Sequence, residues 1–343
     1  MQFLAQYGLF LAKTVTWVAA ILLLLAGILS LLRSAKQQTG NRLEIKNVNE
    51  RLRELAEGLN EELLAAADLK KSTAEQKKAR KREAKQNKKA PPPPKPRVFV
   101  LDFDGDIQAS AVSSLREEIS ALLQVARDDD EVLLRLESGG GLVHSYGLAS
   151  SQLVRLRQRR LKLTVAVDKV AASGGYMMAC VADQVIAAPF AIVGSIGVVA
   201  QIPNFNRLLR KHDIDLELHT AGDYKRTLTM FGENTEAGRA KFREEIQQTH
   251  DLFKRFVADN RPGLDLARVA TGEHWFGSQA LELKLVDRIA TSDDYLLGRT
   301  QDADVYELHY RRRKPLSERL GDSLTRLAAS LRRATHGEMM RPL

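Results

Sequence analysis

Runs of apolar residues alternate with amphipathic segments through the middle of the chain. Four strand-like runs, VFVLDF, EVLLRLE, KLTVAV and QVIAAPF, begin at residues 98, 131, 162 and 184. The segments between them, SSLREEISALLQVARDD, HSYGLASSQLVRLRQRR and SGGYMMACVAD, have apolar residues at helical spacing. Strands that alternate with helices in this way predict right-handed βαβ crossovers, so we expect an α/β domain.

The pattern after the fourth strand run is less regular. Val185–Ile202 is apolar enough to suggest a membrane span, but Pro189, Gly194 and Gly197 interrupt it. We therefore expect buried strands and a turn there. Further on, residues 236–259 predict a long helix, and LELKLVDRI predicts a helix end that runs into a strand.

A transmembrane helix is predicted near the N-terminus. Thr14–Leu32 is 19 residues long and carries no charge, and a helix of that length spans about 28 Å of hydrocarbon. No small-residue cleavage site follows the span, so we expect a retained anchor. Flanking charge favours a cytoplasmic location for the following domain, because one basic residue precedes the span and several follow it, namely Arg33, Lys36, Arg42, Lys46 and Arg51.

The segment after the anchor combines a helical pattern with a basic, proline-rich linker. Apolar residues repeat at three and four positions from Ile45 to Leu59, which predicts an amphipathic helix over about residues 47–69, either a short coiled coil or a helix lying on the domain or membrane. Pro91–Pro94 predicts an extended spacer. The expected organisation is an anchor (1–33), an N-terminal helical arm and linker (34–96), an α/β domain (97–295) and a basic amphipathic tail (296–343) with a leucine stripe.

The basic charge of the chain is concentrated in one segment. The net charge of +9 would suggest nucleic-acid binding, but twelve Lys/Arg and two Glu between Lys70 and Arg97 give that segment a net charge of +10 and leave the rest of the chain at −1. That segment has no aromatic residues for base stacking, so we expect contact with anionic lipid and no specific nucleic acid. The single cysteine, Cys180, excludes an internal disulfide framework and a cysteine-built zinc site.

Two glycine-containing turns could carry chemistry. Ser138-Gly139-Gly140-Gly141 follows a predicted strand and precedes a helix. Backbone N–H groups at such a turn can approach an oxyanion closely, although a plain tight turn and a phosphate site are alternatives. Ser173 lies at a second strand–helix turn, followed by Gly174. Its hydroxyl there suits a nucleophile and suits a helix N-cap equally well.

A serine nucleophile requires a base. No histidine lies between Ser173 and His212, and we expect the seven histidines to be surface or core residues. Lys225, in TAGDYKR, is the alternative base, because a lysine can accept a proton when burial or a neighbouring cation lowers its pKa. The competing interpretation is a solvated loop lysine.

Three motifs in order, VAASGGYMMAC, IVGSIGVV and TAGDYKR, resemble the Ser/Lys peptidases typified by signal peptide peptidase A. The anchor and basic arm are similar to the SohB branch of that family. The resemblance covers about residues 98–289 and implies the ClpP/crotonase fold, Ser173 as nucleophile and Lys225 as general base. It also implies oxyanion donors at Gly140 and Gly174, and Ser195 near the substrate cleft. Many relatives have a proline before the paired glycines, so the choice between Gly139 and Gly140 stays open.

The resemblance also implies the wider setting of the enzyme. It predicts a bacterial inner-membrane serine endopeptidase that needs no metal or cofactor, cleaves signal-peptide remnants or membrane-protein fragments, and assembles from several copies. Relatives place this domain outside the cytoplasm, against the flanking charge. Two other functions compete: a crotonase-like acyl-CoA thioester enzyme, which needs neither Ser173 nor Lys225, and a non-catalytic membrane scaffold.

Overall fold

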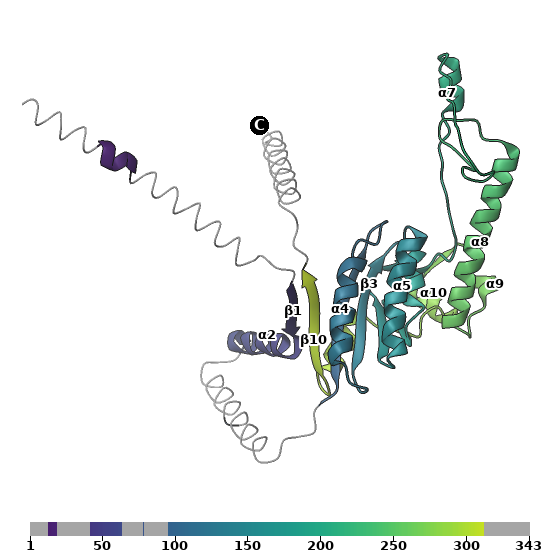
Figure 1. The fold of residues 1–343 in the computed structure, drawn as a ribbon. Helices are drawn as coiled ribbons and strands as arrows, with labels where there is room; N and C mark the ends of the chain where they lie inside the picture. The colour runs from purple at the N-terminus through teal and green to yellow at the C-terminus, as the bar shows by residue number, and fades with distance from the viewer. Residues whose placement is uncertain (1–12, 19–41, 64–77, 79–94, 312–343) are drawn as a thin grey trace, which may run out of the picture. The chain divides into compact units, whose positions relative to one another are not determined.

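A computed structural model describes residues 13–18, 42–63, 78 and 95–311 (Figure 1). Most of the predicted anchor, the basic linker and the leucine stripe of the tail lie outside these residues. No helix among the described residues is long and apolar enough to cross a membrane. Leu43–Tyr310 forms one compact unit.

The centre of the unit is one large, mostly parallel sheet. Its main path runs β1-β10-β2-β3-β4-β6-β9, and β5, β7 and β8 extend it beside β3. The strands are β1 (Arg42–Asn47), β2 (Arg97–Gly105), β3 (Glu131–Ser138), β4 (Lys162–Val167), β5 (Val170–Ala172), β6 (Gln184–Ala187), β7 (Ile192–Gly194), β8 (His274–Phe276), β9 (Arg288–Ile289) and β10 (Asp304–Arg311). Neighbours from β10 to β9 pair in parallel, and β8 pairs antiparallel to β7. The predicted mixed α/β fold is confirmed, and it fits a ClpP/crotonase-like peptidase domain.

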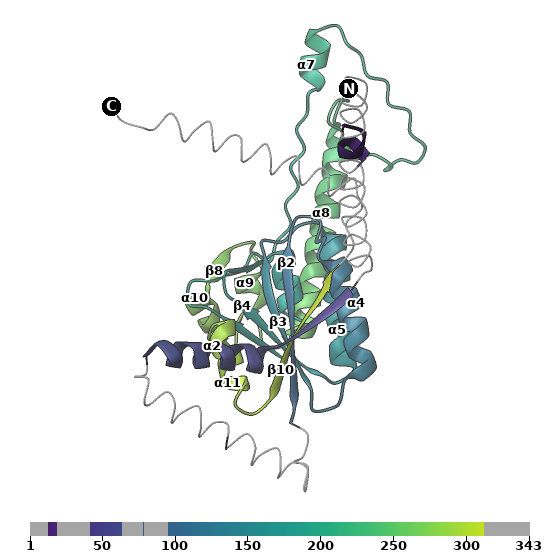
Figure 2. The ribbon, with the colours of Figure 1, turned by 90° about the vertical axis from the view of Figure 1, so that its left-hand side faces the viewer.

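Helices cover both faces of the sheet (Figure 2). They are α2 (Val48–Leu63), α4 (Val112–Val125), α5 (Val143–Gln158), α6 (Gly174–Ala179), α7 (Asn206–Lys211), α8 (Glu236–Asn260), α9 (Leu266–Val269), α10 (Gly277–Glu282) and α11 (Ser292–Arg299). Alternate residues of β2 enter different clusters: Leu101 and Phe103 join the larger core with α4 and α5, whereas Val98 and Val100 pack with α2 and α11. Coverage on both faces explains the continuous apolar strand runs.

The principal predicted elements agree with the structure. The four strand runs correspond to β2, β3, β4 and β6, and the helical patterns correspond to α4, α5, α6 and α8. Residues 185–202 contain most of β6 and all of β7, so this stretch forms buried strands and a turn, as predicted.

The predicted amphipathic helix after the anchor exists as α2, but only its first turns pack on the sheet. Val48 is 2% exposed and Leu52 contacts the smaller core, whereas Leu55 and Leu59 are 65% and 61% exposed. The Asn49 side chain donates to two carbonyl oxygens after α11 and accepts the N–H of β10 residue Val305 at 2.7 Å. Along the sequence, the compact unit therefore extends beyond the expected boundaries of 97–295: it includes β1 and α2 before residue 97, and β10 after residue 295.

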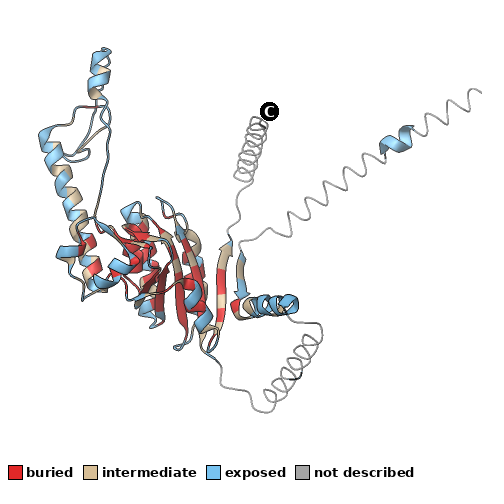
Figure 3. Cartoon of the chain, turned by 180° about the vertical axis from the view of Figure 1, so that it is seen from behind, coloured by how far each residue is buried: buried red, intermediate tan, exposed pale blue. Residues whose placement is uncertain are grey.

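Between β7 and α8 the chain forms a long excursion, residues 199–235, which we call the α7 arm. It lies beside α8, and α7 lies at its far end (Figure 1). The two loop segments of its stem are tied together, because Asn204 donates to the carbonyl oxygens of Thr229 and Gly232, and the ring of Phe205 stacks on that of Phe231 with centroids 6.0 Å apart. Few residues of the arm are buried (Figure 3).

Candidate active site

Ser173 occupies a strained turn between β5 and α6. Its φ of 52° and ψ of −117° are uncommon for a residue with a side chain. The backbone is fixed there, because Ser173 N–H donates to Gly194 O at 2.8 Å and Ser173 O accepts from Met177 N–H at 2.9 Å. The side chain makes no N-cap hydrogen bond. Of the two interpretations from sequence, the nucleophile therefore gains support over the cap.

Ser173 opens onto a cleft of about 580 Å³. Five residues proposed from sequence lie along it: Gly139, Gly140, Ser173, Gly174 and Ser195. They come from segments far apart in the chain, which meet because β3, β5 and β7 are neighbours in the sheet. The structure thus brings the predicted nucleophile together with the predicted glycine donors. Their chemical roles stay predictions.

The glycine loop and the Ser173 turn lie too close for side chains. Gly140 has a φ of +89°, and a Cβ there would lie 2.7 Å from Gly174 N and 2.8 Å from Ser173 Cβ. A Cβ on Gly141 would lie 2.1 Å from Ile107 O. The close approach of Gly140 to the Ser173 turn places peptide groups of the loop beside the nucleophile and beside Gly174 at the start of α6, as an oxyanion site requires. Gly140 N–H donates to Ser138 Oγ at 3.1 Å, so this N–H is already engaged within the protein. The choice between Gly139 and Gly140 as oxyanion donor stays open.

The pattern of the sequence did not identify two side chains behind this loop, Ser138 and Tyr146. Ser138 Oγ lies 2.5 Å from Tyr146 Oη, and Tyr146 Oη donates to Asp106 O at 2.7 Å. Both residues are buried, and burial raises the pKa of Tyr146. A tyrosine in the first turn of a helix gives no sequence signal that separates this position from any core aromatic.

The structure does not place Lys225 in this cleft. Lys225 lies on the α7 arm, where its N–H donates to Gly222 O at 3.1 Å and its side chain is exposed. It is not among the residues that line the cleft beside Ser173. The predicted base is therefore separate from the predicted nucleophile within one chain.

His250, on α8, is the histidine that lines the cleft. It is partly buried, and its Nε2 lies 3.2 Å from Ile196 O, so this nitrogen is positioned to donate to a carbonyl. Nothing in its sequence context distinguishes His250 from the other histidines. It is the structural competitor of Lys225 for the role of base.

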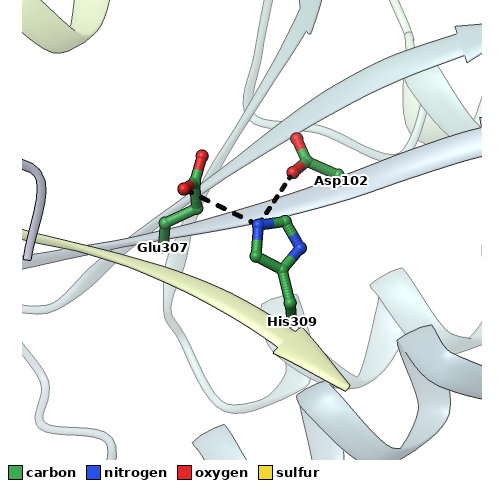
Figure 4. A group of neighbouring side chains, drawn as sticks. All are labelled: Asp102, Glu307 and His309. Atoms are coloured by element: carbon green, nitrogen blue, oxygen red, sulfur yellow. Dashed lines mark ion pairs between the residues drawn. The ribbon is translucent and has the colours of Figure 1, made fainter. Parts of the chain in front are cut away.

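One group of side chains in the described part of the chain resembles a metal-ligand set: Asp102, Glu307 and His309 (Figure 4). His309 Nε2 lies 3.6 Å from an oxygen of each carboxylate. However, the Arg135 guanidinium donates to both carboxylates. Burial would lower the pKa of Arg135, but the two carboxylates raise it above its ordinary value. A cation would have to displace this charge, so we interpret the group as an ion-pair network on the sheet.

Comparison with known proteins identifies the family of the chain. The model of "Peptidase family S49 N-terminal" matches residues 2–153, and that of "Peptidase family S49" matches residues 155–306. "Probable protease SohB" of Haemophilus influenzae is 53% identical over 325 residues, which cover 93% of this chain and 92% of the relative. A protein of the same name from Buchnera aphidicola subsp. Acyrthosiphon pisum is 62% identical over 231 residues, covering 67% and 69%. The chain belongs to peptidase family S49 as a SohB-type member.

Proposed function

We propose that this peptidase is a membrane-anchored serine endopeptidase with Ser173 as nucleophile, Lys225 as general base and the Gly139–Gly141 loop with Gly174 as oxyanion site. The observation that carries the proposal is the strained backbone of Ser173, whose side chain makes no N-cap hydrogen bond, beside loop positions that have no room for a Cβ. A serine held in this way gains no capping energy from its conformation. The conformation does, however, present the hydroxyl to the cleft.

The reaction follows from these groups. A neutral Lys225 amine accepts the Ser173 Oγ proton while Oγ bonds to the scissile carbonyl carbon. The carbonyl oxygen becomes an oxyanion and accepts backbone N–H groups, each worth about 10²–10³ in kcat. The lysine ammonium then protonates the leaving amine as the C–N bond breaks. Water, deprotonated by the lysine, hydrolyses the acyl-enzyme and regenerates Ser173.

Lys225 reaches the reaction through a second copy of the chain. The α7 arm has an ordered stem but exposes large apolar side chains, which favours burial against a partner: Val199, Leu208, Ile214, Leu216, Leu218 and Tyr224 are each 47–82% exposed. An arm seated on a neighbouring subunit would bring Lys225 to that subunit's Ser173. The single copy of each motif in the chain fits a dyad shared across a homo-oligomer.

The cleft supports apolar or small substrate residues. Its walls include Val143, Met177, Val198 and Phe253, with Ser195, Thr249 and Thr271 as polar groups. Signal-peptide remnants and fragments of membrane proteins have this composition. A membrane anchor at Thr14–Leu32 would hold the enzyme near them at the bacterial inner membrane, with the basic linker against anionic lipid.

The side of the membrane is tested by reporter fusions at Pro96. Activity of a fused alkaline phosphatase would place the domain outside the cytoplasm and overturn the orientation that flanking charge favours. Activity of a cytoplasmic reporter at the same position would support that orientation.

The test of the chemistry compares Ser173→Ala and Lys225→Ala with the full-length wild type in detergent. Each variant should lose peptide hydrolysis by at least about 10³-fold, without additivity in the double variant. A thioester enzyme of the crotonase type would instead keep acyl-CoA hydrolysis in both variants. A wild type with neither activity would favour the scaffold and refute the peptidase.

A further inference from the structure

Tyr146 lies directly behind both halves of the proposed oxyanion site. It belongs to the first turn of α5 and is fully buried. Its ring lies under the residue that follows the nucleophile, because a Cβ on Gly174 would lie 2.4 Å from Tyr146 Cγ. Its hydroxyl lies 2.5 Å from the hydroxyl of Ser138, whose Oγ accepts Gly140 N–H. One side chain thus contacts the Gly174 side through its ring and the glycine loop through its hydroxyl.

The hydroxyl is also fixed on its far side. Tyr146 Oη donates to Asp106 O at 2.7 Å, which leaves the Ser138 hydroxyl proton two acceptors, Tyr146 Oη at 2.5 Å and Gly105 O at 3.2 Å, and the shorter contact favours donation to Tyr146. The resulting chain runs from Gly140 N–H through both hydroxyls to the Asp106 carbonyl, and each bond polarises the next. The turn after Asp106 supports the same loop, since Leu142 N–H donates to Ile107 O at 2.8 Å. A shift of the Asp106 carbonyl would therefore move the glycine loop by two routes, through the two hydroxyls and through the hydrogen bond between Ile107 and Leu142.

We propose that Tyr146 is a positioning residue for the peptidase reaction, which sets the spacing between the Gly139–Gly141 loop and Gly174 N–H. The inference rests on the function proposed above. Oxyanion donors act only when they lie about 2.7–3.1 Å from the charged oxygen, so a small change of spacing weakens one of them. Tyr146 is not among the residues that line the cleft, and the substrate ground state should therefore bind as before.

Tyr146→Phe removes the hydroxyl and keeps the ring under Gly174. In the full-length protein, kcat for a peptide should fall about tenfold and KM should stay within about twofold. A peptidyl boronate, whose tetrahedral adduct with Ser173 places an oxygen in the oxyanion site, should bind about tenfold more weakly. Ser138→Ala should reproduce the direction of these changes, and it decides the matter if Tyr146→Phe does not fold.

The matched control is Tyr295→Phe. Tyr295 is a second buried tyrosine, 7% exposed, whose hydroxyl bonds Thr164 at 3.2 Å and the carboxylate of Glu131 within the smaller core. It should lower the melting temperature and leave kcat, KM and boronate affinity at wild-type values. If Tyr146→Phe changes only the melting temperature, as Tyr295→Phe does, the positioning role is wrong. If the wild type neither cleaves peptides nor binds the boronate, the proposed function fails, and the positioning role fails with it.

Discussion

Replacing Gly140 with alanine should separate the geometry of the oxyanion site from general stability. The added Cβ would lie 2.7 Å from Gly174 N, 2.8 Å from Ala172 O and 2.8 Å from Ser173 Cβ. All three neighbours belong to the nucleophile turn, and two of them are backbone atoms that cannot rotate away. The φ of +89° at Gly140 adds strain for any residue with a side chain.

The size of the effect follows from these contacts. Relief requires the loop and the Ser173 turn to separate by several tenths of an ångström, since ordinary Cβ contacts begin near about 3.4 Å. Backbone strain of this kind lowers the free energy of unfolding by about 1–3 kcal/mol. In a domain of this size, each kcal/mol lowers the melting temperature by about 2–4 °C. Displacing one oxyanion donor should lower kcat by about 10²–10³. The catalytic loss should therefore far exceed what the unfolded fraction explains.

The assay measures kcat, KM and the melting temperature of Gly140→Ala beside Gly147→Ala. A Cβ on Gly147 meets nothing within 4 Å, and the residue lies within α5. Alanine there should stabilise the helix by about 0.5–1 kcal/mol and leave kcat unchanged. If Gly140→Ala keeps wild-type kcat while folded, Gly140 does not hold the oxyanion site against Ser173, and the argument from close approach is refuted.

His250→Gln should lower peptide turnover by less than about tenfold, and a loss as deep as that of Ser173→Ala would make His250 the base in place of Lys225. Mixing full-length Ser173→Ala with Lys225→Ala should restore part of the activity of an assembled enzyme, whereas assemblies that stay inactive in every mixture would confine the dyad to one chain. Burial would raise the pKa of Glu307, but Arg135, with smaller contributions from His309 and Arg51, outweighs burial and holds this pKa below its ordinary 4.5. A carboxyl with a lowered folded-state pKa stabilises the protein above its unfolded pKa and loses that contribution as pH falls, so the melting temperature of Glu307→Gln should fall less steeply than that of the wild type below about pH 4.5.

The strands and helices that enclose the site could be predicted because their sequences are locally unambiguous. A run such as Val98–Phe103 is apolar on both faces, as expected for a strand covered on both sides, and β2 contains it. No strand was expected at Asp304–Arg311, although β10 lies beside β2 in the sheet. Its buried Glu307 interrupts the apolar pattern, and the Arg135 guanidinium that compensates this charge comes from a distant segment.

The site shows the same division between local and distant information. The strand–turn–helix setting of Ser173 was readable from sequence, but the choice between nucleophile and N-cap depended on its φ and on the missing cap hydrogen bond. Tyr146 could not be found, because its importance comes from contact with Gly174, a residue distant in sequence. The position of Lys225 could not be predicted either, since the contacts of an exposed arm depend on what covers it.

A peptidyl fluorophosphonate forms a covalent adduct with the nucleophile of a serine peptidase, so it reports directly on Ser173 and on its activation by Lys225. The full-length protein is treated in detergent, digested and analysed by mass spectrometry, with Ser173→Ala and Lys225→Ala treated alongside. We expect one adduct, on the Oγ of Ser173, absent from Ser173→Ala and formed much more slowly in Lys225→Ala. Peptide hydrolysis by a wild type that carries no adduct on Ser173, or an adduct that forms equally fast without Lys225, would refute the Ser173/Lys225 dyad.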